Sequence, residues 1–365
     1  MNKRDFIKTG LIAGMAAPFL SAESLAGVPA PAPLTTPGNN KNFERKNWFW
    51  TRPDRSKSDA ELRDFFKKCR DVGIHGIFFE ADSEKHFNMV KEAGMEAHRW
   101  IWTTNRGERE LLENHPEWYA INRKGESCAD KPPYVGYYRW LCPSREEVQQ
   151  YIVDDMIAQL NKGHVDGIHL DYVRYCDVIL PVNLWKTYNI VQTEELPEYD
   201  YCYCDVCKAK FKEWSGDTLN DIQYPDASLS WRLYRYKTIT DLVNRIAKEA
   251  KAKGKPVTAA VFPTPEVARR NVRQDWINWN LDGVFPMIYH GFYKEKVKWI
   301  GRAVEEGVRG IDGRFPLYAG LYLPDFADNK EVEEGIRYAL ENGAAGISMF
   351  GNVTDEVLKI IGRGG

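Results

Sequence analysis

The sequence predicts an α/β fold, a single (β/α)8 TIM barrel with long loop insertions after its third and fourth strands. Its 365 residues suit a barrel that carries insertions. Short apolar runs alternate eight times with amphipathic stretches, which is the pattern of a parallel sheet covered by helices. No glycine-rich phosphate turn follows the first strand, and this favours a closed barrel over a doubly wound open sheet.

Eight apolar runs are expected to form the strands of the barrel. They are residues 47–50, 76–80, 96–102, 167–171, 256–262, 283–289, 316–322 and 345–350. The insertions are expected over residues 105–143 and 176–226, after the third and fourth of these runs. Both would leave the C-terminal ends of strands, the face where barrel enzymes keep their active sites. We therefore expect both insertions to wall the active-site cleft.

Helices are expected after most of these strands. Ser58 and Glu61 have the spacing of a capping box, which predicts a helix from there to Val72. Glycines follow the ends of several predicted helices, where a residue in the left-handed conformation is needed. They are Gly73, Gly94, Gly254 and Gly343.

Residues 1–26 have the pattern of an export signal. Lys3 and Arg4 precede an apolar run over residues 11–20, and a small-x-small cleavage pattern ends at Ala26. The basic pair is similar to a twin-arginine signal with lysine in the first place, so the Tat and Sec routes both stay open. The apolar run is too short for an ordinary transmembrane helix. We therefore expect a periplasmic or secreted protein.

Residues 27–42 are rich in Pro, Thr, Gly and Asn and predict a flexible linker, which leaves residues 43–365 for the barrel domain. No later stretch has the length and apolarity of a transmembrane segment. The net charge of -2 provides no field that would attract nucleic acid, so nucleic acid is not expected as a partner. Aromatic residues reach 13%, with 12 Trp and 19 Tyr. They could fill core layers or stack on sugar rings.

Four motifs carry a resemblance to a known family. The most specific is the run VDGIHLDYVRY over residues 165–175, supported by His-Arg-Trp at 98–100, His-Pro-Glu-Trp at 115–118 and Pro-Met-Ile-Tyr at 286–289. Together they resemble the glycosyl hydrolase-like family 10, secreted bacterial barrels whose activity is mostly inferred. The resemblance implies a barrel enzyme of the glycoside-hydrolase kind. The sequence departs from the family at Cys176, where proline is usual.

Asp171 is the central candidate for catalysis. It ends the fourth predicted strand, and alternation places it on the inner face together with His169 and Gly167. A buried carboxylate costs several kcal/mol unless it is paired, so packing alone explains it poorly. The structural alternative is an ion pair with Arg174.

Glycoside hydrolysis commonly needs a second carboxylate. Glu80 ranks first because alternation along the second strand gives it the same inward position as Asp171. Asp325 follows Tyr322 in a loop across the barrel mouth and ranks second. Glu266 is better explained as an acid in the first turn of a helix. Asp171 would act as nucleophile or transition-state stabiliser, and Glu80 or Asp325 as proton donor.

Aromatic and polar residues near the same strand ends are expected to bind substrate, because rings stack on sugar C–H groups while His and Arg donate to hydroxyls. They are His98, Trp100, Trp102, His169, Tyr172, Arg174, Tyr289 and Tyr322. Each aromatic side chain could instead belong to the core. His98 and His169 could be core histidines or could bind a metal with Asp171, although the sequence has no His-Glu-x-x-His motif.

Four of the seven cysteines crowd around the second insertion. Cys176, Cys202, Cys204 and Cys207 could form two disulfides or a four-thiolate zinc site, and a structural staple of the insertion is favoured. Cys69 is expected to be a buried free thiol.

The sequence thus predicts an exported glycosidase that cleaves a poly- or oligosaccharide and requires no cofactor and no catalytic metal. Two other classes remain open. One is a barrel that binds a glycan without cleaving it, and the other is a metal-assisted hydrolase or deacetylase. The latter would need His98 and His169 to converge on Asp171.

Overall fold

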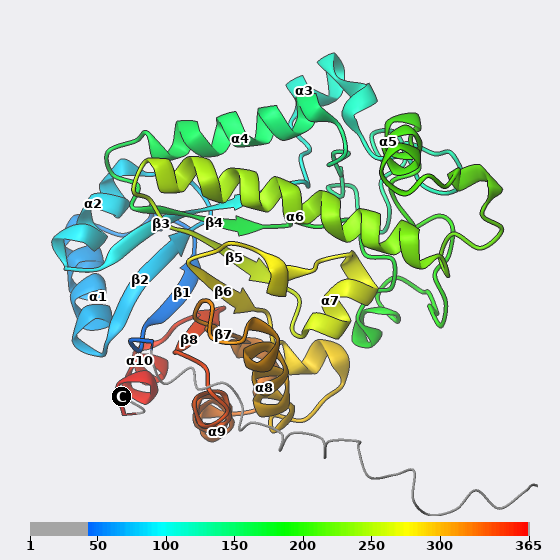
Figure 1. The fold of residues 1–365 in the computed structure, drawn as a ribbon. Coiled ribbons are helices and arrows are strands. Elements are labelled where there is room, and N and C mark those ends of the chain that lie inside the picture. The colour runs from blue at the N-terminus through cyan, green and yellow to red at the C-terminus, as the bar shows by residue number, and fades with distance from the viewer. Residues whose placement is uncertain (1–42, 364–365) are drawn as a thin grey trace, which may run out of the picture. The chain divides into compact units, whose positions relative to one another are not determined.

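The computed structural model describes residues 43–363 (Figure 1). The strands are β1 (Asn47–Thr51), β2 (Ile74–Phe79), β3 (Glu96–Trp102), β4 (Gly167–Asp171), β5 (Val257–Val261), β6 (Gly283–Pro286), β7 (Ala319–Tyr322) and β8 (Ile347–Phe350). The helices are α1 (Asp59–Asp71), α2 (Glu84–Glu92), α3 (Arg109–Asn114), α4 (Glu146–Leu160), α5 (Asp205–Ser215), α6 (Leu229–Ala252), α7 (Pro265–Val272), α8 (Trp299–Ile311), α9 (Asn329–Glu341) and α10 (Asp355–Arg363). The predicted export signal and linker, residues 1–42, lie outside the described residues.

The eight strands form one parallel sheet in the order β6-β5-β4-β3-β2-β1-β8-β7. The edge strands β6 and β7 meet through the isolated parallel bridges Val284–Leu317 and Met287–Gly320. This seam turns the sheet into a nearly closed barrel, with helices packed around it (Figure 1). The predicted fold class is therefore confirmed, and β3 and β4 have the predicted bounds.

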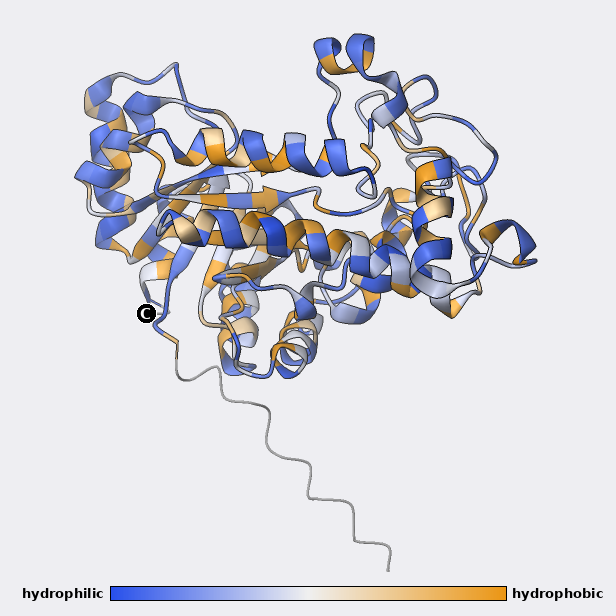
Figure 2. Cartoon of the chain, turned by 45° about the horizontal axis from the view of Figure 1, so that its top comes forward, coloured by the Kyte–Doolittle hydropathy of each residue, from blue (hydrophilic) through white to orange (hydrophobic). Residues whose placement is uncertain are grey.

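The predicted local signals for helix α1 are present. The Ser58 side chain accepts from the Glu61 backbone amide, and the Glu61 carboxylate accepts from the Ser58 amide at 2.8 Å. Gly73 follows the helix with a φ of +84°. Leu62, Phe66 and Cys69 form its buried face. Other helices also combine hydrophobic and hydrophilic residues, as Figure 2 shows.

Cys69 is a free, buried thiol, as predicted. Burial raises its pKa to about 12, which leaves it protonated at neutral pH. It therefore behaves as a small apolar residue of the core.

Aromatic rings fill the inside of the barrel. Phe78 stacks on Trp48 with ring centroids 4.8 Å apart and on His169 at 3.8 Å, and it meets Phe285 edge to face at 4.9 Å. Tyr318 stacks on Phe285 at 4.8 Å. Part of the high aromatic content therefore belongs to the core and not to substrate binding.

Two long segments leave the C-terminal ends of neighbouring strands. Residues 103–145 connect β3 to α4, and residues 172–228 connect β4 to α6. The two segments pair with each other at the antiparallel bridge between Asn122 and Tyr201. In Figure 1 they form the part of the molecule that contains α3 and α5.

Within residues 43–363, none of the helices combines the length and the apolar character that crossing a bilayer requires.

Candidate active site

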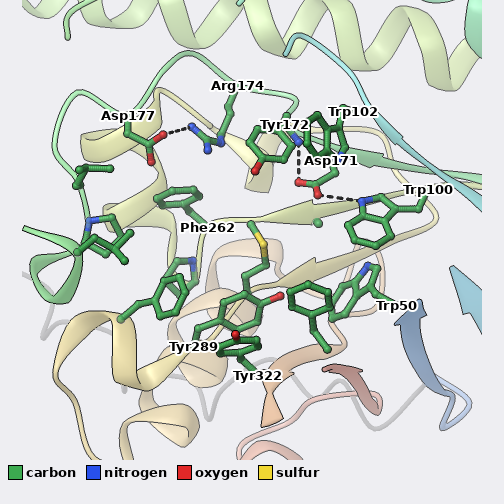
Figure 3. Close-up of a pocket in the computed structure, with 18 of the residues that line it drawn as sticks. Trp50, Trp100, Trp102, Asp171, Tyr172, Arg174, Asp177, Phe262, Tyr289 and Tyr322 are labelled. Atoms are coloured by element: carbon green, nitrogen blue, oxygen red, sulfur yellow. Dashed lines mark hydrogen bonds and ion pairs between the residues drawn. The ribbon is translucent and has the colours of Figure 1, made fainter. Parts of the chain in front are cut away.

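A cavity of about 660 Å³ opens at the C-terminal mouth of the barrel (Figure 3). From the strands and their ends it is lined by Trp50, Glu80, Trp100, Asp171, Phe262 and Tyr322. From the two long segments it is lined by Tyr134, Tyr138, Arg174, Asp177 and Tyr188, among others. This size and mixture of aromatic and charged walls suit a polar organic ligand.

Asp171 is buried in the wall of the cavity, with 7% of its surface exposed. Its Oδ2 accepts from Trp100 Nε1 at 2.9 Å and its Oδ1 from the Tyr172 backbone amide at 2.7 Å (Figure 3). Burial raises the pKa of Asp171, although these hydrogen bonds and the charge of Arg174 act to lower it. The charge of Glu80 adds to the rise. The two carboxylates therefore interact within one site.

Glu80 follows the last residue of β2 and lines the cavity, as inward alternation predicts. Its carboxylate accepts a hydrogen bond from Arg52, whose side chain is 78% exposed. The Glu80 side chain itself is 18% exposed. Glu80 thus lies in a wetter environment than Asp171 and has a cationic neighbour.

The ion-pair partner of Arg174 differs from Asp171, the partner that the sequence suggested. Its Nη1 donates to Asp177 Oδ2 at 2.8 Å, and both side chains are buried. Its guanidinium also lies 4.7 Å from the ring centroid of Trp140 and 5.0 Å from that of Phe262. Among the described residues the ion-pair partner of Arg174 is Asp177. The structural alternative for Asp171, an ion pair with Arg174, is therefore wrong.

Six of the eight expected substrate-binding residues line the cavity. They are Trp100, Trp102, Tyr172, Arg174, Tyr289 and Tyr322. His98 and His169 do not line the cavity and lie inside the barrel. On each strand the residue two positions further along, Trp100 or Asp171, reaches the mouth instead.

His169 is a core histidine whose hydrogen bonds are used internally. Its Nε2 accepts from Trp50 Nε1 at 2.8 Å, and its Nδ1 lies 2.8 Å from Thr258 Oγ1. Burial lowers its pKa well below the usual value, so the ring is neutral. His98 Nε2 lies 2.8 Å from Glu96 Oε2. Neither ring is hydrogen-bonded to Asp171. The metal site that the sequence left open for His98, His169 and Asp171 is therefore not formed.

The other two candidate acids lie elsewhere. Asp325 belongs to the short helix η7 (Leu323–Asp325), and its carboxylate accepts from the Gly291 backbone amide at 2.9 Å. It is not among the residues that line the cavity. Glu266 is exposed in the first turn of α7, as expected of a helix-start acid. Of the three candidate acids, Glu80 is the one that lines the cavity together with Asp171.

Sequence reasoning missed the residues that the long segments bring to the cavity. Tyr134, Tyr138, Asp177 and Tyr188 all belong to this group. The tyrosine-rich run over residues 134–138 was a usable signal, because several rings gather within a segment that leaves a strand end.

The cysteine cluster also differs in composition from the expected one. Cys202, Cys204 and Cys207 gather with Cys142 from the segment after β3. Cys176 is buried outside this cluster, with its Sγ 3.8 Å from the Asp177 carbonyl oxygen. The expectation that Cys176 is the fourth member is therefore wrong, because the pairing of the two segments brings Cys142 there instead.

Solved structures show the same fold at low sequence identity. A beta-galactosidase from the psychrophilic Marinomonas ef1 has a TM-score of 0.56 and 11% identity, and the match covers 84% of this chain and 54% of that one. The catalytic domain of a beta-amylase from Paenibacillus polymyxa has a TM-score of 0.57 and 10% identity, with 86% and 94% covered. The GH42 beta-galactosidase Gan42B from G. stearothermophilus has a TM-score of 0.57 and 12% identity, with 88% and 57% covered. This chain thus spans about half the length of the two galactosidases.

Sequence comparison with curated proteins finds no match. The sequence profile of the family described as Glycosyl hydrolase-like 10 matches residues 84–306, more than half of the 365 residues. The matched region contains Asp171 and the two long segments, while Glu80 lies just before it. The chain therefore belongs to the glycosyl hydrolase-like 10 family.

Proposed function

We propose that this chain hydrolyses a glycosidic bond of an oligo- or polysaccharide, with Asp171 and Glu80 as its two catalytic carboxylates. The observation that carries the proposal is that both carboxylates line one aromatic cavity at the C-terminal mouth and that the charge of Glu80 affects the pKa of Asp171. Two interacting carboxylates in different surroundings are what proton donation and stabilisation of an oxocarbenium-like transition state require.

From the surroundings of the two acids, we propose the two roles in the reverse of the order expected from the sequence. Burial raises the pKa of Asp171, which favours the protonated form that a donor to the leaving oxygen needs. Glu80 has Arg52 beside it and is more exposed to water, and these surroundings suit a nucleophile or a base toward water. We therefore propose Asp171 as the proton donor.

Sugar binding is proposed for the rings around these acids. Trp102 and Tyr172 lie 4.8 Å apart by ring centroids, and Tyr289 and Tyr322 lie 5.2 Å apart. Both pairs line the cavity and offer apolar faces to sugar C–H groups.

The test compares Asp171→Asn and Glu80→Gln on aryl glycosides with good and poor leaving groups, after a glycan panel has identified the sugar. A leaving group that departs without a proton should restore turnover to Asp171→Asn but not to Glu80→Gln. If Glu80 is the nucleophile, azide should rescue a smaller side chain, Glu80→Ala, and yield a glycosyl azide in which the C–N bond replaces the cleaved C–O bond.

If a good leaving group restores turnover to Glu80→Gln but not to Asp171→Asn, Glu80 is the proton donor and Asp171 has the other role. A wild-type chain that binds glycans of the panel but turns none of them over would contradict the proposal and identify a non-catalytic glycan-binding barrel. Full turnover by both variants would exclude this pair of acids.

We also propose that the chain is exported, from the basic residues, the short apolar run and the cleavage pattern within residues 1–26. Fractionation of the producing cell should find a shortened chain outside the cytoplasm. An intact chain confined to the cytoplasm would contradict this.

A further inference from the structure

Four cysteine sulfurs outside the cavity form one compact group. The Sγ atoms of Cys142, Cys202, Cys204 and Cys207 all lie within 4.8 Å of one another, and all four residues are buried. Cys142 comes from the segment after β3, and the other three come from the segment after β4 and the start of α5.

The spacing of the sulfurs fits a metal better than disulfides. Cys142 Sγ is 3.6 Å from Cys204 Sγ and 3.5 Å from Cys207 Sγ, so no single partner is selected. A disulfide would need about 2.05 Å. Four sulfurs placed tetrahedrally about 2.3 Å from a central zinc ion would be ~3.8 Å apart, close to these separations.

The groups around the sulfurs suit thiolates. The Ile121 backbone amide donates to Cys202 Sγ at 3.3 Å. Ser144 Oγ accepts from the Tyr234 hydroxyl at 3.1 Å and from the Cys207 thiol at 3.2 Å. Toward a Cys207 thiolate the Ser144 hydroxyl would donate its own proton instead. Donors to the ligand sulfurs are the usual second layer of a metal site.

Positive charge lies close by as well. Cys204 is the N-cap residue of α5 and Cys207 lies in its first turn, where the helix dipole favours negative charge. Arg145 lines the same surface pocket as Cys204, so its guanidinium adds positive charge near the cluster. A zinc ion bound by four thiolates has a net charge of -2, which these positive ends would offset.

We propose that Cys142, Cys202, Cys204 and Cys207 bind a structural zinc ion that fastens the two cavity-walling segments to each other. The first segment carries Tyr134 to the cavity and the second carries Asp177. The ion would thus hold the outer wall of the cavity while taking no part in bond cleavage.

The test measures the zinc content of the full chain purified without a polyhistidine tag. About one zinc per chain is expected, Cys142→Ala should lose it, and the matched control Cys176→Ala should keep it. This pair is informative because both thiols are buried and only the first belongs to the cluster.

A second measurement needs no variant. Unfolding the unreduced wild-type chain in a chelator should release the zinc and expose all seven cysteines to a thiol reagent. Replacing zinc with Co²⁺ should give the thiolate-to-cobalt absorption of a tetrahedral site. Disulfides within the cluster, seven free thiols without bound metal, or cobalt without that absorption would each overturn the proposal.

Discussion

The strand side of the cavity, which includes Glu80 and Asp171, grows directly from the barrel, whereas the segment side, which includes Tyr134, Asp177 and Tyr188, belongs to two long segments. Glu80 and Asp171 stand at the ends of strands that are hydrogen-bonded to neighbours on both sides. The segment side has short helices and few hydrogen bonds between backbone strands. The positions of its residues therefore depend on side-chain contacts.

Buried ion pairs supply many of these contacts. Arg174 binds Asp177, and Asp200 is fully buried between Arg235 and Arg273. Because breaking a buried pair leaves one charge without a partner, stability on the segment side depends on individual polar side chains. On the strand side the backbone holds the position, and the side chains are available for chemistry. Loss of a buried carboxylate should therefore affect activity on the strand side and folding on the segment side.

The largest effect is expected from Asp171→Asn on the strand side. The variant keeps the shape of the side chain but cannot exchange the proton, so turnover of the natural glycan should fall by about 10²–10⁴-fold or more. Thermal stability should be unchanged or higher, because burial already disfavours the charged form. Kinetics and melting curves check both. A large loss of stability would place Asp171 among the structural residues.

The difference in unfolding free energy between Asp171→Asn and the wild type should depend on pH in one direction. The folded pKa of Asp171 is raised above the unfolded value of about 3.9, so the native state binds the proton more tightly. The contribution of this group is most favourable at low pH and is lost as pH rises through the folded pKa. The advantage of Asp171→Asn over wild type in unfolding free energy should therefore grow with pH above about 4.

Asp177→Asn tests the segment side. It leaves the buried Arg174 guanidinium without a carboxylate, and the free energy of unfolding should fall by about 3–5 kcal/mol. The control Glu305→Gln breaks an exposed pair with Arg309 on α8 and should cost less than about 1 kcal/mol. Denaturant unfolding measures both. Equal losses of unfolding free energy in the two variants would show that the buried pair stabilises the fold no more than the exposed pair does.

Trp100→Phe weakens the strand side without removing an acid. It deletes the Nε1–H that donates to Asp171 while leaving an aromatic ring. Turnover should fall about 10-fold, from the loss of one charge-assisted hydrogen bond. The pKa of Asp171 should rise further, so the alkaline limb of the pH–rate profile should move to higher pH. Trp276→Phe removes a buried indole outside the cavity and should leave the profile in place.

Tyr188→Ala is expected to have the smallest effect. Tyr188 lines the cavity from the segment side and is partly exposed, so its loss should raise KM a few-fold and leave kcat unchanged. Tyr224 is 63% exposed and does not line the cavity, and Tyr224→Ala should change neither constant. A fall in kcat for Tyr188→Ala would show that the segment side also takes part in chemistry.

The strand side could be predicted from the sequence because its rules are local. A two-residue alternation and the bounds of β3 and β4 suffice to place Trp100 and Asp171 on the inner face at the mouth. The same alternation gives His169 its inward direction but not its depth. His98 and His169 were expected at the mouth, and both lie below it, inside the barrel.

The segment side could not be predicted in the same way because its contacts join distant parts of the chain. Nothing in the spacing of Cys202, Cys204 and Cys207 selects Cys142 over Cys176, since the choice depends on how two irregular segments pair. The Arg174–Asp177 pair was accessible in principle, because the residues are three apart. It was missed because Asp171 offered an equally close carboxylate.

The seam between β6 and β7 has a consequence for how the barrel opens. In the described part of the chain this junction has isolated bridges in place of a continuous ladder, with hydrogen bonds such as Tyr318 N to the Val284 oxygen at 2.9 Å and Ile288 N to the Gly320 oxygen at 2.8 Å. Fewer bonds must break together there, so the first partial unfolding should begin at this edge. Amide protons at the seam should exchange with solvent before those of the β3–β4 ladder, and a cut or a new terminus should be tolerated best between these two strands.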